Sequence, residues 1–158
     1  MSRTSLNVKL LDVTRNPLAL IYSACRQCYS EQFAGDIFEE IKENVSKQEV
    51  FVRKVVSSGH ESPLEHVKFT FAIEGVSRAL THQLVRHRVA SYSQQSQRYV
   101  KEDDFDFIVP PLIAEDPVMS SIFEKIMSQI QEGYSNILAI LREKGTEGEK
   151  ANQDARFV

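Results

Sequence analysis

The stretch HVKFTFAIE, residues 66–74, decides the fold. Its apolar side chains alternate with polar ones, and Ala72 is the one break on the polar side. The alternating apolar residues are Val67, Phe69, Phe71 and Ile73. A period of two is typical of a strand with one buried face. We therefore predict a strand here, and another at residues 6–13, where the chain has a largely apolar run.

Helical signals lie on both sides of these strands. Apolar residues at helical spacing predict helices at residues 18–28, 78–89 and 118–144, the last about 40 Å long. Capping patterns predict helices at 36–45 and 47–57 and a single turn at 62–65, and residues 151–158 are helix-like. The predicted N-caps are Asp36, Ser46, Ser62, Ser77 and Asp116.

These elements define the fold class. A chain of 158 residues, 42% hydrophobic and 26% charged, fits one globular domain, residues 1–158. The sequence predicts an α+β fold, in which an antiparallel sheet packs with helices, one of them long. No apolar run reaches the roughly 20 residues that cross a bilayer, and the first residues lack the hydrophobic block of a secretory signal. We expect a cytoplasmic protein with no membrane partner.

The charged residues are distributed unevenly. Residues 76–101 carry five basic residues and no acidic one, whereas the remainder carries 14 basic and 22 acidic residues. The five are Arg78, Arg86, Arg88, Arg98 and Lys101. Guanidinium groups bind phosphate oxygens two at a time, so this segment predicts a site for a phosphorylated small molecule. The structural alternative is a solvated basic face that partly neutralises the end of the preceding helix.

Residues 91–100 favour a strand or strand-like loop, in which Gln94, Ser96 and Arg98 project to one side and line a wall. A second hypothesis is a module that binds nucleotides or single-stranded nucleic acid, with Tyr92 and Tyr99 stacking on bases. The net charge of −3 disfavours nucleic acid as a partner. A third hypothesis is a structural fragment or pseudoenzyme whose site does not close.

The cysteines and histidines do not define a metal site. Cys25 and Cys28 have the spacing of a redox pair or half a metal site, but two reduced thiols near a core-facing helix are the simpler interpretation. His60 and His66 lack the spacing of a helical zinc motif, so we expect hydrogen-bonding roles and no metal. The scattered glycines form no phosphate loop, so side chains must hold any nucleotide cofactor.

Two motifs resemble those of the flavin-dependent thymidylate synthases. Arg86-His87-Arg88, followed after seven residues by Ser96, is similar to that family's signature. Residues 58–66, Ser-Gly-His-Glu-Ser-Pro-Leu-Glu-His, resemble its block before a strand. Further agreement comes from Gln83, Ser91-Tyr92 and Gln97-Arg98-Tyr99. The resemblance covers most of the chain.

The resemblance implies a homotetrameric enzyme with active sites between subunits. Such an enzyme transfers the one-carbon unit of methylenetetrahydrofolate to dUMP and forms dTMP, with FAD as hydride carrier and NADPH as reductant. No cysteine attacks the pyrimidine in this chemistry, so the two cysteines need no catalytic role. The protein supplies orientation and charge stabilisation.

The resemblance also assigns residues by position. Those that would hold FAD are His60, Ser62, Arg86, His87, Arg88 and Gln94. Those that would surround dUMP are Gln83, Arg86, Gln94, Gln95, Ser96, Gln97, Arg98 and Arg156. The wall expected from alternation coincides with this set at Gln94, Ser96 and Arg98.

Two departures from the family pattern affect these expectations. Gln94 stands where some members have Glu, which puts in question a role that needs a negative charge there. Family members continue past a segment like residues 155–158, and the arginine that activates the dUMP base is expected in that continuation. We therefore assign no catalytic residue, and expect an N-terminal portion of the enzyme that alone binds ligands weakly or incompletely.

Overall fold

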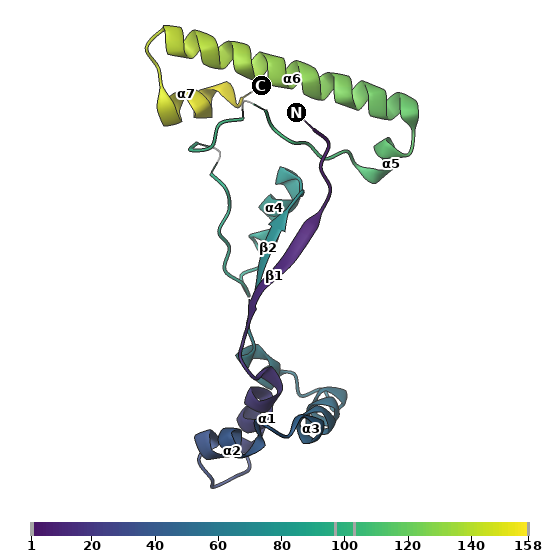
Figure 1. Cartoon of the computed structure of the whole chain (residues 1–158), viewed down its shortest axis with the longest axis vertical. Coiled ribbons are helices and arrows are strands. Elements are labelled where there is room, and N and C mark those ends of the chain that lie inside the picture. Colours follow the sequence, from purple (N-terminus) through teal and green to yellow (C-terminus); the bar gives the residue numbers. More distant parts are fainter. Residues whose placement is uncertain (1, 97, 103, 158) are drawn as a thin grey trace. The chain divides into compact units, whose positions relative to one another are not determined.

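The computed structural model describes residues 2–96, 98–102 and 104–157. The chain divides into two compact units, one formed by Met1–Asn7 with Ile73–Val158 and the other by Val8–Ala72. Figure 1 follows the elements of both units along the chain by colour. The single domain over residues 1–158 stays a prediction.

The Val8–Ala72 unit has a small core built around one helix. Its helices are α1 (Pro17–Gln27), α2 (Ala34–Ile41), α3 (Val45–Ser57) and the 3-10 helix η1 (Ser62–His66). α1 packs against each of the other three. The buried apolar side chains of this core are Ala19, Ile21, Ile37 and Ile41. The buried Gln48 of α3 donates from Nε2 to the Ile41 carbonyl at 2.6 Å, which ties α3 to the end of α2.

Three predicted N-caps of this unit are wrong, although each predicted helix is present; α2 ends at Ile41, earlier than the predicted Val45. The caps are Phe33 for α2, Asn44 for α3 and Glu61 for η1, in place of Asp36, Ser46 and Ser62. The Asn44 side chain accepts from the Lys47 backbone N–H at 3.1 Å. Asparagine caps helices as well as serine does, so α3 begins before the position that Ser46 predicts.

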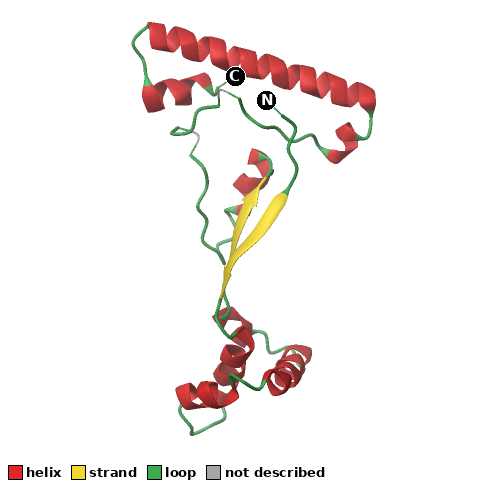
Figure 2. Cartoon of the chain, viewed as in Figure 1, coloured by secondary structure: helices red, strands yellow, loops and turns green. Residues whose placement is uncertain are grey.

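The two predicted strands are confirmed as β1 (Asn7–Val13) and β2 (Phe69–Glu74), which pair in a two-stranded sheet (Figure 2). The pairing is antiparallel, because residues from opposite ends of the two strands meet. The Thr14 backbone N–H donates to the Lys68 carbonyl at 3.0 Å, and Asn7 Nδ2 donates to Glu74 Oε1 at 2.6 Å.

The predicted burial of one strand face is wrong for this chain. Phe69, Phe71 and Ile73 are 58%, 52% and 45% exposed. The alternation correctly predicted the strand, but burial of its apolar face needs a second layer of structure. Within the described residues, β1 and β2 have no third strand beside them.

The unit formed by Met1–Asn7 with Ile73–Val158 is organised by one long helix. Its helices are α4 (Arg78–Leu84), α5 (Pro111–Ala114), α6 (Pro117–Glu143) and α7 (Gly148–Ala155). The 27 residues of α6 span about 40 Å at 1.5 Å per residue, as predicted. Tyr134 and Leu138 of α6 pack with Ala151 and Ala155 of α7 in a buried cluster. None of the described helices is long and apolar enough to cross a membrane.

Asp116 begins α6, as predicted. Its carboxylate accepts from the backbone N–H groups of Val118 at 2.8 Å and Met119 at 2.9 Å. We expect Asp116→Ala to lower the free energy of unfolding by about 1 kcal/mol, because two N–H groups lose their acceptor. Asp116→Asn keeps an acceptor and should lose less than half as much. Urea denaturation measures both, and equal losses would contradict the capping role.

α4 is shorter than predicted. Its cap, Ser77, is confirmed, since the hydroxyl accepts from the Leu80 N–H at 3.1 Å, but the helix ends at Leu84 rather than near Val89. The backbone then tightens, with Arg86 N–H donating to the Gln83 carbonyl and His87 N–H to the Leu84 carbonyl. The cluster Arg86-His87-Arg88 therefore lies on turns after the helix.

Two further segments differ from their predicted secondary structure. Residues 91–96 and 98–100 contain no strand, and their backbone is irregular. The helix predicted at residues 151–158 is α7, which begins at Gly148 and ends at Ala155. In both segments the polar side chains therefore lie in positions that differ from those expected from the sequence.

Candidate functional site

A cavity of about 680 Å³ lies in the unit that contains α4, α6 and α7. We call it the arginine cavity. It is lined by Arg78, Gln94, Gln95, Ser96, Arg98, Gln153, Arg156 and Phe157. Three guanidinium groups, a hydroxyl and three amides therefore meet there, and none of the described lining residues is acidic. This donor-rich chemistry fits a ligand with a phosphate and a polar ring.

Five residues predicted to surround a nucleotide line this cavity. They are Gln94, Gln95, Ser96, Arg98 and Arg156. Adjacent Gln94 and Gln95 both contribute, so the segment does not have the strict alternation of a strand. Gln94 Nε2 also donates to the Thr81 hydroxyl of α4 at 2.6 Å, which ties the segment to that helix.

Arg98 lies at the exposed part of the arginine cavity. Its Nη1 lies 2.8 Å from Oε1 of Glu149, in the first turn of α7. Its guanidinium carbon lies 5.7 Å from the centre of the Tyr99 ring. The Ser96 hydroxyl accepts from the Arg98 backbone N–H at 3.2 Å. Arg98 is therefore an accessible cation whose backbone is fixed by its neighbour.

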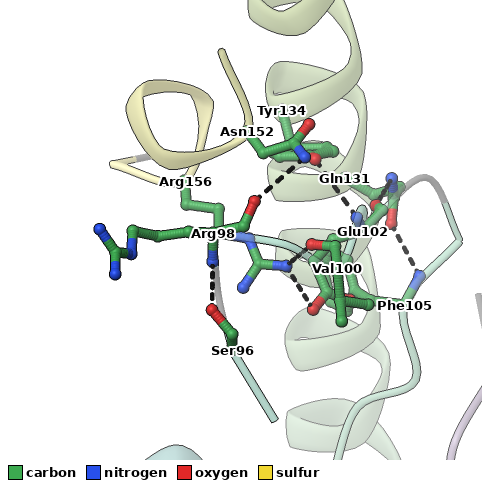
Figure 3. Close-up of polar contacts among 9 residues, drawn as sticks. All are labelled: Ser96, Arg98, Val100, Glu102, Phe105, Gln131, Tyr134, Asn152 and Arg156. Carbon is green, nitrogen blue, oxygen red and sulfur yellow. Dashed lines mark hydrogen bonds and ion pairs between the residues drawn. The ribbon is translucent and has the colours of Figure 1, made fainter. Parts of the chain in front are cut away.

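Arg156 is held more firmly than Arg98 (Figure 3). From the end of α7 its Nη2 donates to the Val100 carbonyl and, at 2.8 Å, to Oε1 of Glu102. The side chain is 14% exposed, and its buried Nε has no hydrogen-bond partner among the described residues. Arg156 thus lines the cavity, while its Nη2 group is directed at the segment that follows Arg98.

Three residues that sequence reasoning missed fix the same segment from α6 and α7 (Figure 3). Asn152 Nδ2 donates to the Arg98 carbonyl at 3.2 Å, and the Tyr134 hydroxyl accepts from the Glu102 N–H at 3.2 Å. Gln131 donates to the Glu102 carbonyl at 2.8 Å and accepts from the Phe105 N–H at 3.2 Å. For Gln131 and Tyr134 the signal in the sequence was weak: polar residues within the apolar pattern of a long helix.

The Gln131 side-chain amide both donates to and accepts from backbone groups, and its removal tests this arrangement. We expect Gln131→Ala to lower the free energy of unfolding by about 1–3 kcal/mol, since two part-buried backbone groups lose a partner. Gln129→Ala, an exposed glutamine on the same helix, is the matched control and should change stability by less than about 0.5 kcal/mol. Thermal or urea denaturation of both variants checks this, and equal stabilities would contradict it.

A second cavity of about 520 Å³ adjoins the first, because Arg78, Gln95, Ser96 and Arg156 line both. Arg78 begins α4, and the sequence analysis counted its charge without assigning it to a site. Its position at both cavities adds a third guanidinium to the site. The signal was present in the basic segment, but only the fold brings Arg78 to the same cavity as Gln95 and Ser96.

Other predicted site residues do not line the arginine cavity. Gln83 belongs to α4, and Arg86, His87 and Arg88 lie on the exposed turns after it. The His87 carbonyl accepts from the Tyr92 hydroxyl at 3.1 Å, which braces that turn. Gln97, also predicted to contact the nucleotide, lies outside the described residues.

His60 and Ser62 belong to the Val8–Ala72 unit, where they line a cavity of about 370 Å³. The other lining residues are Cys25, Arg26, Cys28, Tyr29, Phe51, Val55 and Pro63. Burial, and to a smaller extent the nearby Cys28, raises the pKa of the Cys25 thiol above its ordinary value. The thiol therefore stays protonated at neutral pH and is a poor nucleophile. Among the described residues, no cluster of three or more His, Cys, Asp or Glu side chains could hold a metal ion.

The fold is of the α+β class, and the arginine cavity gathers donors of the kind that phosphorylated polar ligands need. A family model described as thymidylate synthase complementing protein matches residues 9–158. The chain belongs to this family, and its resemblance to the flavin-dependent thymidylate synthases is confirmed.

Individual relatives are named flavin-dependent thymidylate synthases. The chain is 50% identical over 161 residues to the flavin-dependent thymidylate synthase of Nitratidesulfovibrio vulgaris, covering 100% of this chain and 66% of that protein. It is 50% identical over 163 residues to that of Clostridium tetani, covering 96% of this chain and 63% of that protein. The chain thus spans a little under two thirds of the length of these relatives.

A solved structure shares the fold. It is a UMP/dUMP methylase, PolB from Streptomyces cacaoi, in a crystal structure with bound 5-Br dUMP. The TM-score is 0.68 at 21% sequence identity, covering 99% of this chain and 68% of that one. The likeness confirms the α+β class.

Proposed function

We propose that this protein acts as a flavin-dependent thymidylate synthase. It transfers the one-carbon unit of methylenetetrahydrofolate to dUMP, with NADPH as reductant, and yields dTMP. The observation that carries the proposal is the arginine cavity, where five residues expected around dUMP meet. The identity of 50% to two flavin-dependent thymidylate synthases supports the same reaction.

The chemistry of the arginine cavity suits a uridine nucleotide. Arg98 and the Ser96 hydroxyl provide charged and neutral donors for the phosphate oxygens. Gln94 and Gln95 each carry an amide donor and acceptor, which complement the N–H and carbonyl groups of a uracil ring. Gln83, Arg86 and Gln97 complete the proposed set of dUMP-binding residues. Binding here orients the pyrimidine, and no cysteine acts as nucleophile.

FAD, when bound, supplies the hydride for the transferred carbon. We assign its binding to His60, Ser62, Arg86, His87, Arg88 and Gln94. In each unit by itself, the residues present suit part of such a group. In the Val8–Ala72 unit His60 and Ser62 line a cavity with the aromatic Tyr29 and Phe51, and in the other unit the exposed Arg86 and Arg88 carry donors that suit a pyrophosphate. The proposal also includes a cytoplasmic homotetramer with its active sites between subunits. The exposed apolar face of β2 is compatible with packing against another subunit.

Two measurements on the purified protein test this function. Calorimetry should detect dUMP binding that is at least tenfold tighter than that of deoxyuridine, because the arginines recognise the phosphate. Equilibrium dialysis with FAD should leave more flavin on the protein side than on the buffer side, measured by the flavin absorbance near 450 nm. Equal affinities for nucleotide and nucleoside, or no excess of flavin on the protein side, would count against the proposal. Tight binding of single-stranded oligonucleotides instead would favour a nucleic-acid module.

A further inference from the structure

Arg98, the cation expected to bind the nucleotide phosphate, forms an ion pair with Glu149. We propose that Glu149 is a displaceable counter-anion of Arg98, which lowers the affinity of the arginine cavity for anionic ligands until a phosphate group takes its place. This inference rests on the proposed function, since it assigns Arg98 to the phosphate of dUMP. It adds a residue that tunes ligand affinity without lining the cavity.

The geometry makes the pair easy to open. The two charged atoms lie 2.8 Å apart, but the side chain of Arg98 is 54% exposed and that of Glu149 is 41% exposed. Water screens such a pair and solvates both partners once they separate. A phosphate group offers more charge than a carboxylate and several oxygens to the same guanidinium fork. A bound nucleotide therefore competes successfully for Arg98.

The neighbouring ion pair of Arg156 provides a contrast within the same site. The side chains of Arg156 and Glu102 are 14% and 33% exposed, and the Arg156 guanidinium also donates to the Val100 carbonyl. Opening that pair would leave partly buried groups without partners, which is costly. We therefore assign Arg156 and Glu102 to positioning the segment after Arg98, and assign the exchangeable contact to Arg98 and Glu149 alone.

Glu149 retains a favourable position after Arg98 leaves it. It lies in the first turn of α7, where the partial positive charge of the helix end stabilises a carboxylate. The released Glu149 needs no new partner. Its negative charge at the edge of the cavity nevertheless repels incoming anions, so it lowers affinity for charged ligands more than for neutral ones.

The test compares Glu149→Gln with Glu147→Gln, which removes the same charge two residues earlier at the start of α7. Isothermal titration calorimetry with dUMP at low ionic strength should give binding about three- to tenfold tighter for Glu149→Gln than for the wild type. Glu147→Gln should change affinity less than twofold. In high salt the gain of Glu149→Gln should shrink, because the charge that it removes is screened.

Deoxyuridine, which has the same ring and no phosphate, separates the possible outcomes. Its affinity should be equal in the wild type and Glu149→Gln. Equal or weaker binding of dUMP by Glu149→Gln would overturn the inference and leave the proposed function in place. If the wild type binds no dUMP, the proposed function fails and the inference fails with it. An equal gain with both ligands would assign the effect to cavity shape and would also overturn the inference.

Discussion

Arg98→Ala is expected to weaken dUMP binding by about 1.5–3 kcal/mol, the scale of a hydrogen bond to a charged group. This corresponds to a loss of affinity of roughly 10- to 150-fold. The reason is the position of Arg98: it lines the arginine cavity, its side chain is accessible, and its backbone N–H is fixed by the Ser96 hydroxyl. Of the arginines there, Arg98 is the one whose present partner a phosphate can readily replace.

Calorimetry with dUMP and deoxyuridine measures the effect. Arg98→Lys keeps the charge but loses the planar fork. It should therefore bind dUMP more weakly than the wild type and more tightly than Arg98→Ala. Arg142→Ala removes an exposed arginine at the end of α6 and serves as the control, with an expected change under twofold. Unchanged affinity in Arg98→Ala would contradict the role assigned to this residue.

Much of the secondary structure could be predicted because its signals are local. The alternation over residues 66–74 identified β2, and the apolar spacing with Asp116 identified α6 within one residue of its observed ends. Both signals depend on neighbours a few residues away. The burial of the β2 face could not be predicted, since it depends on which layer packs against the sheet.

The candidate site was predicted in part. Gln94, Ser96 and Arg98 meet in one cavity as expected, although the segment is an irregular loop. The role of Glu149 could not be foreseen, because it lies about 50 residues further along and reaches Arg98 only when α7 folds. Gln131, Tyr134 and Asn152 were missed for the same reason: each binds backbone groups of a distant segment, and a sequence pattern carries no record of such contacts.

The end of α4 illustrates a second limit. The apolar spacing of residues 78–85 predicts a helix that continues to Val89, yet the chain leaves the helix after Leu84. No residue of α4 is buried, and the apolar Leu80 and Val85 are 47% and 38% exposed. Helices of this length depend on tertiary packing more than on propensity, so the apolar spacing alone does not fix where such a helix ends.

Gly75→Ala is expected to lower the free energy of unfolding by more than about 3 kcal/mol, the largest stability effect that we predict. Gly75 follows β2 and has φ of 65°, a conformation that side chains disfavour. A Cβ atom there would also overlap the carbonyl oxygen of Ser5, just before β1. The obstacle is backbone, so no side-chain rotation relieves it, and the chain before β1 would have to move.

Gly133→Ala is the matched control, because it makes the same chemical change inside α6, where a Cβ meets open space. Alanine lowers the entropy of the unfolded chain and favours helix, so this variant should gain about 0.5–1 kcal/mol. The two substitutions therefore have opposite expected signs in one urea denaturation series. A Gly75→Ala variant as stable as the wild type would mean that Ser5 and Gly75 do not approach closely. Equal losses at both glycines would instead point to a general intolerance of alanine, which the open space around Gly133 argues against.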